Sequence, residues 1–143
     1  MAQITDITLS SLFFFEGKSS DASGNDSLRL DGFMLDKDVN GKKIHVTLDF
    51  QLTSLKISLL SFRYYLTYSY TDEEDASHLK AAVILAHAVP YVRELIANIT
   101  MRSSGKPICL STINTNNLYK DFLDRERQQA EQQQAEQNQP NIR

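Results

Sequence analysis

The chain has 143 residues, about the length of one domain, and 41% of them are hydrophobic, which is enough for a modest core. Its formal net charge is −3, and the pair Lys42-Lys43 is too short to form a basic stripe, so nucleic acid is not an expected partner. The single cysteine, Cys109, excludes an internal disulfide framework and disfavours a cysteine-based metal site.

The sequence also argues against a signal peptide and against membrane insertion. No basic region opens the N-terminus, and the apolar run at residues 12–15 is too short for a signal core and is followed directly by Glu16. No apolar stretch is expected to reach the length that spans a bilayer. The expected location is therefore the cytoplasm.

The N-terminal segment is predicted to be a β-strand with an unusual surplus of aromatic side chains. Residues 4–16 are apolar and β-prone, and Phe13, Phe14 and Phe15 are consecutive. Neighbouring side chains on a strand point to opposite faces. Either both faces of this strand are covered, or some of these rings are available to a partner.

Turn signals and alternation then predict an antiparallel sheet. Residues 17–27 are Ser-, Gly- and Asp-rich and are predicted to form a loop, and Gly32 predicts a bulge. The sequence Asp-Val-Asn-Gly at residues 38–41 predicts a hairpin with positive φ angles at Asn-Gly. Residues 44–53 alternate between apolar and polar side chains, which is typical of a strand with one buried and one wet face.

The apolar alternation changes phase at Leu59-Leu60. One flat strand cannot change phase and still bury a single face, so a bulge, bend or strand break is expected there. The run that follows is rich in tyrosine, including Tyr64, Tyr68 and Tyr70. Tyrosine combines an apolar ring with a polar tip, so this run suits either a core or a half-wet contact surface.

Helical periodicity extends over residues 79–101. Its apolar stripe consists of Leu85, Ala88, Val92, Leu95, Ile96 and Ile99. Pro90 lacks an amide donor and clashes with the preceding turn, so it is predicted to lie in the first turn of the main helix. A shorter helical piece at residues 77–86 would precede it, with Asp75 or Ser77 as the cap.

A second helix is predicted after a crossing loop. Residues 114–116 supply its cap, and Leu118 and Phe122 lie on its apolar side. From residue 125 onward Gln, Glu and Arg dominate, so residues 125–143 are predicted to be a polar tail, mobile or partly helical, outside the core. The folded α+β domain is expected to be residues 1–124.

No combination of residues predicts catalysis. His45 is expected on the wet face of a strand, and His78 and His87 are nine residues apart, so solvated or capping histidines are favoured over metal ligands. The consecutive acids at residues 72–75 favour a solvated turn over an acid–base pair. No phosphate loop, metalloprotease motif or nucleophile elbow is found. We expect no enzyme activity, no cofactor and no metal.

Three short motifs resemble the SecB family of export chaperones. Residues 89–94, Val-Pro-Tyr-Val-Arg-Glu, resemble the Phe-Pro-Tyr-Ala-Arg-Glu-like motif that opens the family's first long helix. Residues 107–110 with Asn114 and Leu118-Tyr119 resemble the segment that leads into its last helix, and Phe15-Glu16 resembles a motif near its start. With the predicted strands, the resemblance covers residues 4–124.

The resemblance implies an α+β fold in which a four-stranded antiparallel sheet has two helices on one face, assembled as a homotetramer, a dimer of dimers. It implies no catalysis, no cofactor, and unfolded polypeptide clients held in long apolar grooves. For each residue matched to the groove, the alternative is a place in the core or in a subunit contact. These groove candidates are Phe15, Val89, Tyr91, Ile96, Leu118 and Tyr119.

Some positions depart from the family pattern. The family docks its motor protein, SecA, through acids on the outer face of the sheet. Glu16 matches one of these acids, but Leu12 stands where a second is expected, and Arg63 and Tyr64 lie about where a mid-sheet acid is expected. SecA is therefore only a candidate partner, whereas client binding is expected.

These observations predict an ATP-independent molecular chaperone, a holdase, that binds unfolded or preprotein clients, with export as one task. One alternative is a SecB-like chaperone for an antitoxin-type client. Another is an oligomeric scaffold that uses the fold without clients. A third is a small-molecule binder with a pocket between helices and sheet.

Overall fold

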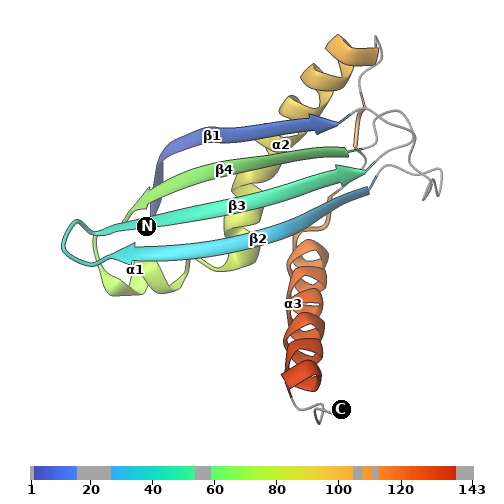
Figure 1. Ribbon diagram of the computed structural model, residues 1–143. Coiled ribbons are helices and arrows are strands. Elements are labelled where there is room, and N and C mark those ends of the chain that lie inside the picture. The colour runs from blue at the N-terminus through green and yellow to red at the C-terminus, as the bar shows by residue number, and fades with distance from the viewer. Residues whose placement is uncertain (1, 16–26, 54–58, 105–107, 111–112, 138–143) are drawn as a thin grey trace.

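The computed structural model describes residues 2–15, 27–53, 59–104, 108–110 and 113–137. Four strands are followed by three helices along the chain (Figure 1). These elements are β1 (Gln3–Phe15), β2 (Ser27–Asp38), β3 (Lys43–Thr53), β4 (Leu59–Ser69), α1 (Glu73–Ser77), α2 (Ala81–Ser104) and α3 (Thr115–Gln137).

The strands form one antiparallel sheet in the order β1-β4-β3-β2, so β1 and β2 are its edges. In Figure 1, α2 runs obliquely across the back of the sheet, and α3 projects beyond the edge formed by β2. Phe33 of β2, opposite Leu48, contacts Tyr119 of α3 with ring centroids 5.5 Å apart. The predicted α+β class, with helices on one face of a four-stranded sheet, is confirmed.

The core lies between α2 and the alternating apolar face of the two central strands. Ile44 is opposite Tyr68 and Leu48 is opposite Tyr64, and all four side chains are buried. Tyr70 is buried as well, so the tyrosine-rich run belongs to the core rather than to a contact surface. A helix covers this face of the sheet and keeps water away from the rings. These tyrosines therefore do not form the half-wet contact surface that was the alternative.

The change of alternation phase coincides with a strand end. β3 ends at Thr53 and β4 begins at Leu59, and in both strands the buried side chains have even numbers. The residues between them, 54–58, lie outside the described part of the chain. The predicted bulge at Gly32 is confirmed, because the register with β3 shifts between Leu30 and Gly32.

Two irregularities in β1 decide which of its side chains face the helices. The register with β4 shifts between Ile4 and Asp6 and again between Leu9 and Ser11. Each shift inserts one residue and reverses the alternation. As a result one row of apolar side chains shares the helix side of the sheet, namely Ile4, Ile7, Leu9, Leu12 and Phe14, which pair with the inward-facing positions of β4. Phe13 points to the outer face.

The hairpin between β2 and β3 is present, but its turn differs from the predicted one. The residue with positive φ is Lys42 (φ 51°), and the turn is not a primed turn centred on Asn-Gly. Gly41 instead contacts Asp38: its amide donates to Oδ1 of Asp38 at 3.1 Å, and a Cβ there would lie 2.7 Å from Oδ2 of the same carboxylate. A larger residue at this position would therefore displace the Asp38 side chain.

Helix α1 begins at an acidic cap. Oδ1 of Asp72 accepts a hydrogen bond from the amide of Asp75 at 2.8 Å, so Asp72 is the N-cap and the prediction of Asp75 or Ser77 is wrong. The acids that follow lie in the first turn, where they favour the positive end of the helix dipole. Glu73 also forms an ion pair with Lys37 of β2. The acidic run is therefore a helix start rather than an irregular turn.

Helix α2 is continuous through Pro90, which corrects the predicted break before that residue. Proline cannot donate to the carbonyl of Ala86, but both residues are exposed, so water can satisfy that carbonyl. Packing of the predicted stripe, with Leu85, Ala88 and Val92 fully buried, holds the two halves of the helix in line.

Residues 81–102 of α2 are long and apolar enough, by length and composition, to cross a membrane, with a mean hydropathy of 1.3. The prediction that no stretch reaches that length is therefore wrong. The core helix of a folded domain meets the same criteria, and the buried stripe of α2 is packed against the sheet.

Helix α3 begins at the predicted cap, since Oδ1 of Asn114 accepts from the amide of Asn117 at 3.2 Å. Leu118 and Phe122 are buried, and the guanidinium of Arg125 donates to the carbonyl of Leu30 on the edge strand β2. The helix then continues to Gln137 with every side chain beyond Arg125 exposed. The division of the chain at residue 125 stays a prediction.

Candidate functional site

A row of apolar side chains on β1 is only partly covered on the helix side of the sheet. Ile4, Leu9 and Leu12 are 37%, 38% and 45% exposed although they share a face with the core, and Ile7 and Phe14 are half-buried. We name these five residues the β1 strip. β1 is also an edge strand, so in the described part of the chain its outer backbone edge is unpaired.

Helix α2 borders this strip with Tyr91. The hydroxyl of Tyr64 donates to the carbonyl of Tyr91 at 3.3 Å, and Tyr64 lies opposite Leu9 on β1. Burial raises the pKa of Tyr64, and the carboxylate of Glu94 raises it further, so the hydroxyl keeps its proton and remains a donor. Tyr91, whose side chain is 43% exposed, therefore belongs to the part of α2 that lies next to the strip.

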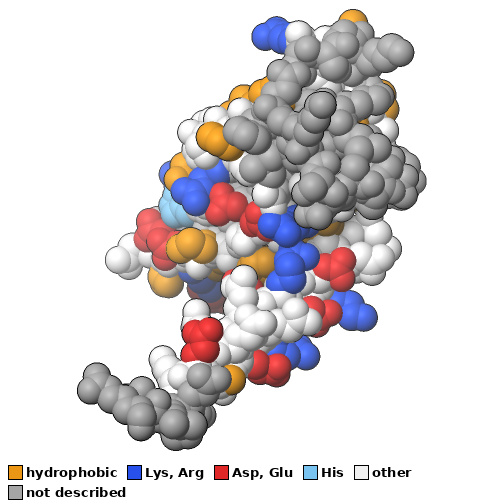
Figure 2. Space-filling view, turned by 45° about the vertical axis from the view of Figure 1, so that its right-hand side comes forward, with side chains coloured by type: hydrophobic (Ala, Val, Ile, Leu, Met, Phe, Trp, Pro, Cys, Tyr) orange, Lys and Arg blue, Asp and Glu red, His pale blue; other side chains and the backbone are white. Residues whose placement is uncertain are grey.

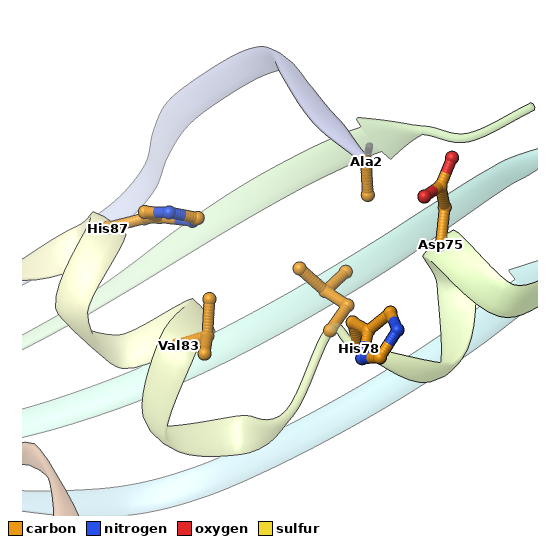
Figure 3. A pocket seen from close by; sticks show the side chains of 6 residues that line it. Ala2, Asp75, His78, Val83 and His87 are labelled. Carbon is orange, nitrogen blue, oxygen red and sulfur yellow. The ribbon is translucent and has the colours of Figure 1, made fainter.

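A hollow of about 330 Å³ lies at the N-terminal end of the strip, between the start of β1 and the corner that joins α1 to α2. We name it the α1–α2 hollow. Figure 3 shows side chains from all three elements around one space. Its lining residues are Ala2, Asp75, His78, Leu79, Val83 and His87.

The two histidines of the hollow were not predicted to lie together. His78 is the C-cap of α1, and His87 lies on α2; both line the same space. Nδ1 of His87 lies 2.9 Å from the hydroxyl of Tyr68. Spacing rules for a single helix could not reveal this, since the two histidines belong to different helical segments.

The groove candidates named from the sequence fall into separate groups. Tyr91 is exposed beside the β1 strip, whereas Leu118 and Tyr119 lie on α3 at the opposite edge, where Leu118 is buried and Tyr119 is half-buried. Ile96 has no exposed surface, and Val89 is half-buried. The side chain of Phe15 lies outside the described part. Their assignment to client binding stays a prediction, and the β1 strip was not singled out in advance.

The outer face of the sheet carries charges of both signs together with the exposed apolar side chains of Phe13, Met34 and Tyr65. Arg63 binds Asp49 in a bidentate pair, with Nε–Oδ1 and Nη2–Oδ2 distances of 2.6 and 3.1 Å. Figure 2 shows acidic, basic and hydrophobic side chains interspersed over the described surface in that view. Leu12 and Tyr64 face the helices instead, and Glu16 lies outside the described residues.

No family model matches the chain, and no curated protein matches its sequence. Solved structures do match. A SecB-like chaperone from Mycobacterium tuberculosis, solved in complex with a ChAD peptide from the HigA1 antitoxin, aligns with a TM-score of 0.59 at 20% identity, over 78% of this chain and 90% of that chain. A protein of unknown function from Streptococcus agalactiae aligns at a TM-score of 0.46 and 12% identity, over 78% of this chain and 98% of that chain.

The chain therefore has a SecB-like fold, which confirms at the level of the fold the resemblance carried by the three sequence motifs. The similarity extends over most of both chains, so it exceeds one supersecondary unit.

Proposed function

We propose that this protein is an ATP-independent chaperone, a holdase of the cytoplasm, that holds extended segments of non-native polypeptides on the β1 strip. The observation that carries the proposal is the row of partly covered apolar side chains on the helix side of an edge strand. Contiguous exposed apolar surface marks interaction sites, and an unpaired strand edge offers main-chain donors and acceptors to an extended chain.

An antitoxin-type protein is the client class that we favour. The Mycobacterium tuberculosis chaperone with this fold was solved with an antitoxin peptide, which supports a polypeptide client of that kind. In the described part of the chain no cluster of three His, Cys, Asp or Glu side chains could hold a metal. Apolar contacts and main-chain hydrogen bonds tolerate many sequences, so a client would be held by noncovalent contacts alone.

We further propose a homotetramer, a dimer of dimers, in which part of the strip stays accessible. A client-free scaffold is the second candidate, and the same strip supports it, since a subunit contact would also cover apolar surface. Docking to SecA for export has less support: Leu12 faces the helices, and the Arg63 charge on the outer face is neutralised by Asp49.

Light scattering of an aggregating denatured client tests the proposal. Stoichiometric amounts of this protein, without nucleotide, should slow aggregation of several unrelated clients. Leu12→Asp should weaken the effect several-fold, because it places a charge in the strip. Phe13→Asp is the matched control, since Phe13 is the next residue, is 57% exposed and points to the outer face.

Circular dichroism should show both variants to be folded, because both side chains are largely exposed. Unchanged aggregation with the wild-type protein would contradict the holdase function. Negligible binding of a hydrophobic dye to the native assembly would favour the scaffold. Equal losses in the two variants would show that the strip is not the binding surface.

A further inference from the structure

We infer that the α1–α2 hollow is an anchor pocket for one aromatic side chain of a bound polypeptide, with tryptophan or tyrosine preferred. The inference rests on the proposed chaperone function for its partner, but it concerns a separate site with its own variant. The hollow is lined by residues of three elements that the sequence did not associate.

The size and lining of the hollow fit one ring system. Its volume of about 330 Å³ is at the lower end of the range of about 300–1,000 Å³ that is usual for ligand sites. Ala2, Leu79 and Val83 supply apolar walls, and Val83 is 41% exposed although it belongs to a largely apolar helix. An aromatic side chain combines a large apolar area with few rotatable bonds, and this favours it as an anchor.

Polar groups at the rim suit a ring with a polar tip. The hydroxyl of Tyr68 and Nδ1 of His87 lie 2.9 Å apart and share a hydrogen bond, which holds the imidazole at the rim. His87 is exposed, so its other ring nitrogen can form a hydrogen bond with a polar group of the bound chain.

The hollow adjoins the start of β1. One of its lining residues, Ala2, lies directly before β1 and two residues before Ile4, the first side chain of the strip. From Ala2 to Leu12 an extended backbone covers about 33 Å at about 3.3 Å per residue. A bound segment that places its aromatic residue in the hollow and follows the strip would therefore be about ten residues long.

A second copy of this chain does not supply such an anchor from its described residues. To enter the hollow of another copy, an aromatic side chain must stand out from the surface of its own subunit. Among the described elements, the one that stands out in this way is α3 beyond Phe122. That segment contains no aromatic side chain. The exposed aromatic residues Phe13, Tyr65 and Tyr91 lie on the sheet and on α2. An extended client has no such restriction.

The test uses indole fluorescence, because the protein has no tryptophan and any indole emission comes from the probe. The probes are N-acetyltryptophanamide and a ten-residue alternating apolar peptide with one terminal tryptophan, compared with the same peptide carrying alanine there. The wild-type protein should blue-shift the emission in a saturable way. It should bind the tryptophan peptide at least tenfold more tightly than the alanine peptide, as a competition assay with a labelled peptide would measure.

Val83→Glu should abolish this tenfold preference, since it places a carboxylate in the apolar wall. It should remain folded, because Val83 is exposed and an acid in the first turn of α2 favours the helix dipole. Met101→Glu is the matched control and should keep the preference. Met101 is 52% exposed on the same helix, eighteen residues or five turns away, about 27 Å along the same face.

Several results would overturn the inference. They are no saturable shift with the wild-type protein, equal behaviour of the two variants, or a change of oligomeric state caused by Val83→Glu on size-exclusion chromatography, which would place a second copy in the hollow. If the wild-type protein slows aggregation but shows no preference for tryptophan, the anchor pocket fails and the chaperone proposal stands. If it binds the indole probes but slows no aggregation, the hollow is a small-molecule site and the client anchor is wrong.

Discussion

Single hydrogen bonds of buried residues join α2 to the rest of the molecule. The hydroxyl of Thr100 is fully buried, donates to the carbonyl of Ile96 and accepts from the amide of Ile108, both at 2.7 Å. Nearer the other end of the helix, the hydroxyl of Tyr68 forms a hydrogen bond with Nδ1 of His87 at 2.9 Å. A buried polar group left without a partner costs about 1–3 kcal/mol, so loss of either contact should destabilise the fold.

Replacing Thr100 by valine should therefore lower the free energy of unfolding by about 1–3 kcal/mol, because the amide of Ile108 loses its acceptor. Thr100→Ser keeps the hydroxyl and should cost clearly less. Urea denaturation measures both. Equal losses in the two variants would show that methyl packing, not the hydrogen bond, matters at this position.

Tyr68 makes stability depend on alkaline pH. Its pKa is raised by burial to about 12 from an ordinary value near 10, so above pH 10 the unfolded chain loses a proton that the folded chain retains. Stability is unaffected below pH 10 and falls between pH 10 and pH 12, by at most about 3 kcal/mol. Tyr68→Phe should make this fall shallower in urea titrations at pH 8 to 12. A slope equal to that of the wild-type protein would contradict the prediction; Tyr64, whose pKa is also raised, accounts for a residual fall.

At the scale of elements, the irregularities of β1 and α2 have opposite consequences. Two register shifts in β1 collect its apolar side chains on one face, beyond what strict alternation allows. Helix α2 tolerates Pro90 because the stripe on the other side of the helix supplies packing and the unsatisfied carbonyl faces solvent. The register shifts of β1 create the strip, whereas Pro90 only lowers the stability of α2 locally.

Pro90→Ala should therefore stabilise the protein, by about 1–3 kcal/mol, since alanine restores the missing hydrogen bond to Ala86 and proline is about 3 kcal/mol less favourable than alanine in a helix interior. Thermal or urea denaturation would show it. Pro90→Gly should gain less, because glycine is about 1 kcal/mol less favourable than alanine. A loss of stability in Pro90→Ala would mean that the ring makes a contact needed for packing.

At the scale of the whole molecule, the two edges of the sheet are treated differently. The β2 edge receives α3, whose Tyr119 packs on Phe33 and whose Arg125 binds the carbonyl of Leu30. The β1 edge has no neighbouring strand in the described part of the chain, and although α2 crosses behind β1 and continues past this edge (Figure 1), Ile4, Leu9 and Leu12 remain 37%, 38% and 45% exposed. An unpaired edge with exposed apolar side chains is a site for association unless another element protects it. The difference between the two edges therefore favours β1 as the place where a client binds.

The exposed C-terminal part of α3 should be dispensable for folding. Removal of residues 128–143 keeps Arg125 and should change the free energy of unfolding by less than about 0.5 kcal/mol, as expected for surface positions. Suppression of aggregation should be unchanged. Removal of residues 124–143 deletes Arg125 and should cost more. A loss of chaperone activity with the shorter deletion would place client contacts on the tail.

Several features were predictable because they depend on neighbours along the chain. Alternation at residues 44–53 identified the central strand, the apolar stripe identified the buried face of α2, and Asn114 identified the start of α3. Where prediction was wrong, a distant contact had overridden a local rule. Pro90 lies mid-helix because packing holds the helix in line, and the primed turn was replaced by an Asp38–Gly41 contact.

The amino-acid sequence by itself indicated the strands, the two long helices and their order, and its short motifs were enough to indicate the SecB-like fold. Only the tertiary structure decided which apolar residues stay exposed, because this depends on where α2 crosses the sheet and on the two bulges of β1. Periodicity tells which side chains share a face; it does not tell how much of that face another element covers. For this reason the buried tyrosines, the β1 strip and the joint lining of one hollow by His78 and His87 emerged only in three dimensions.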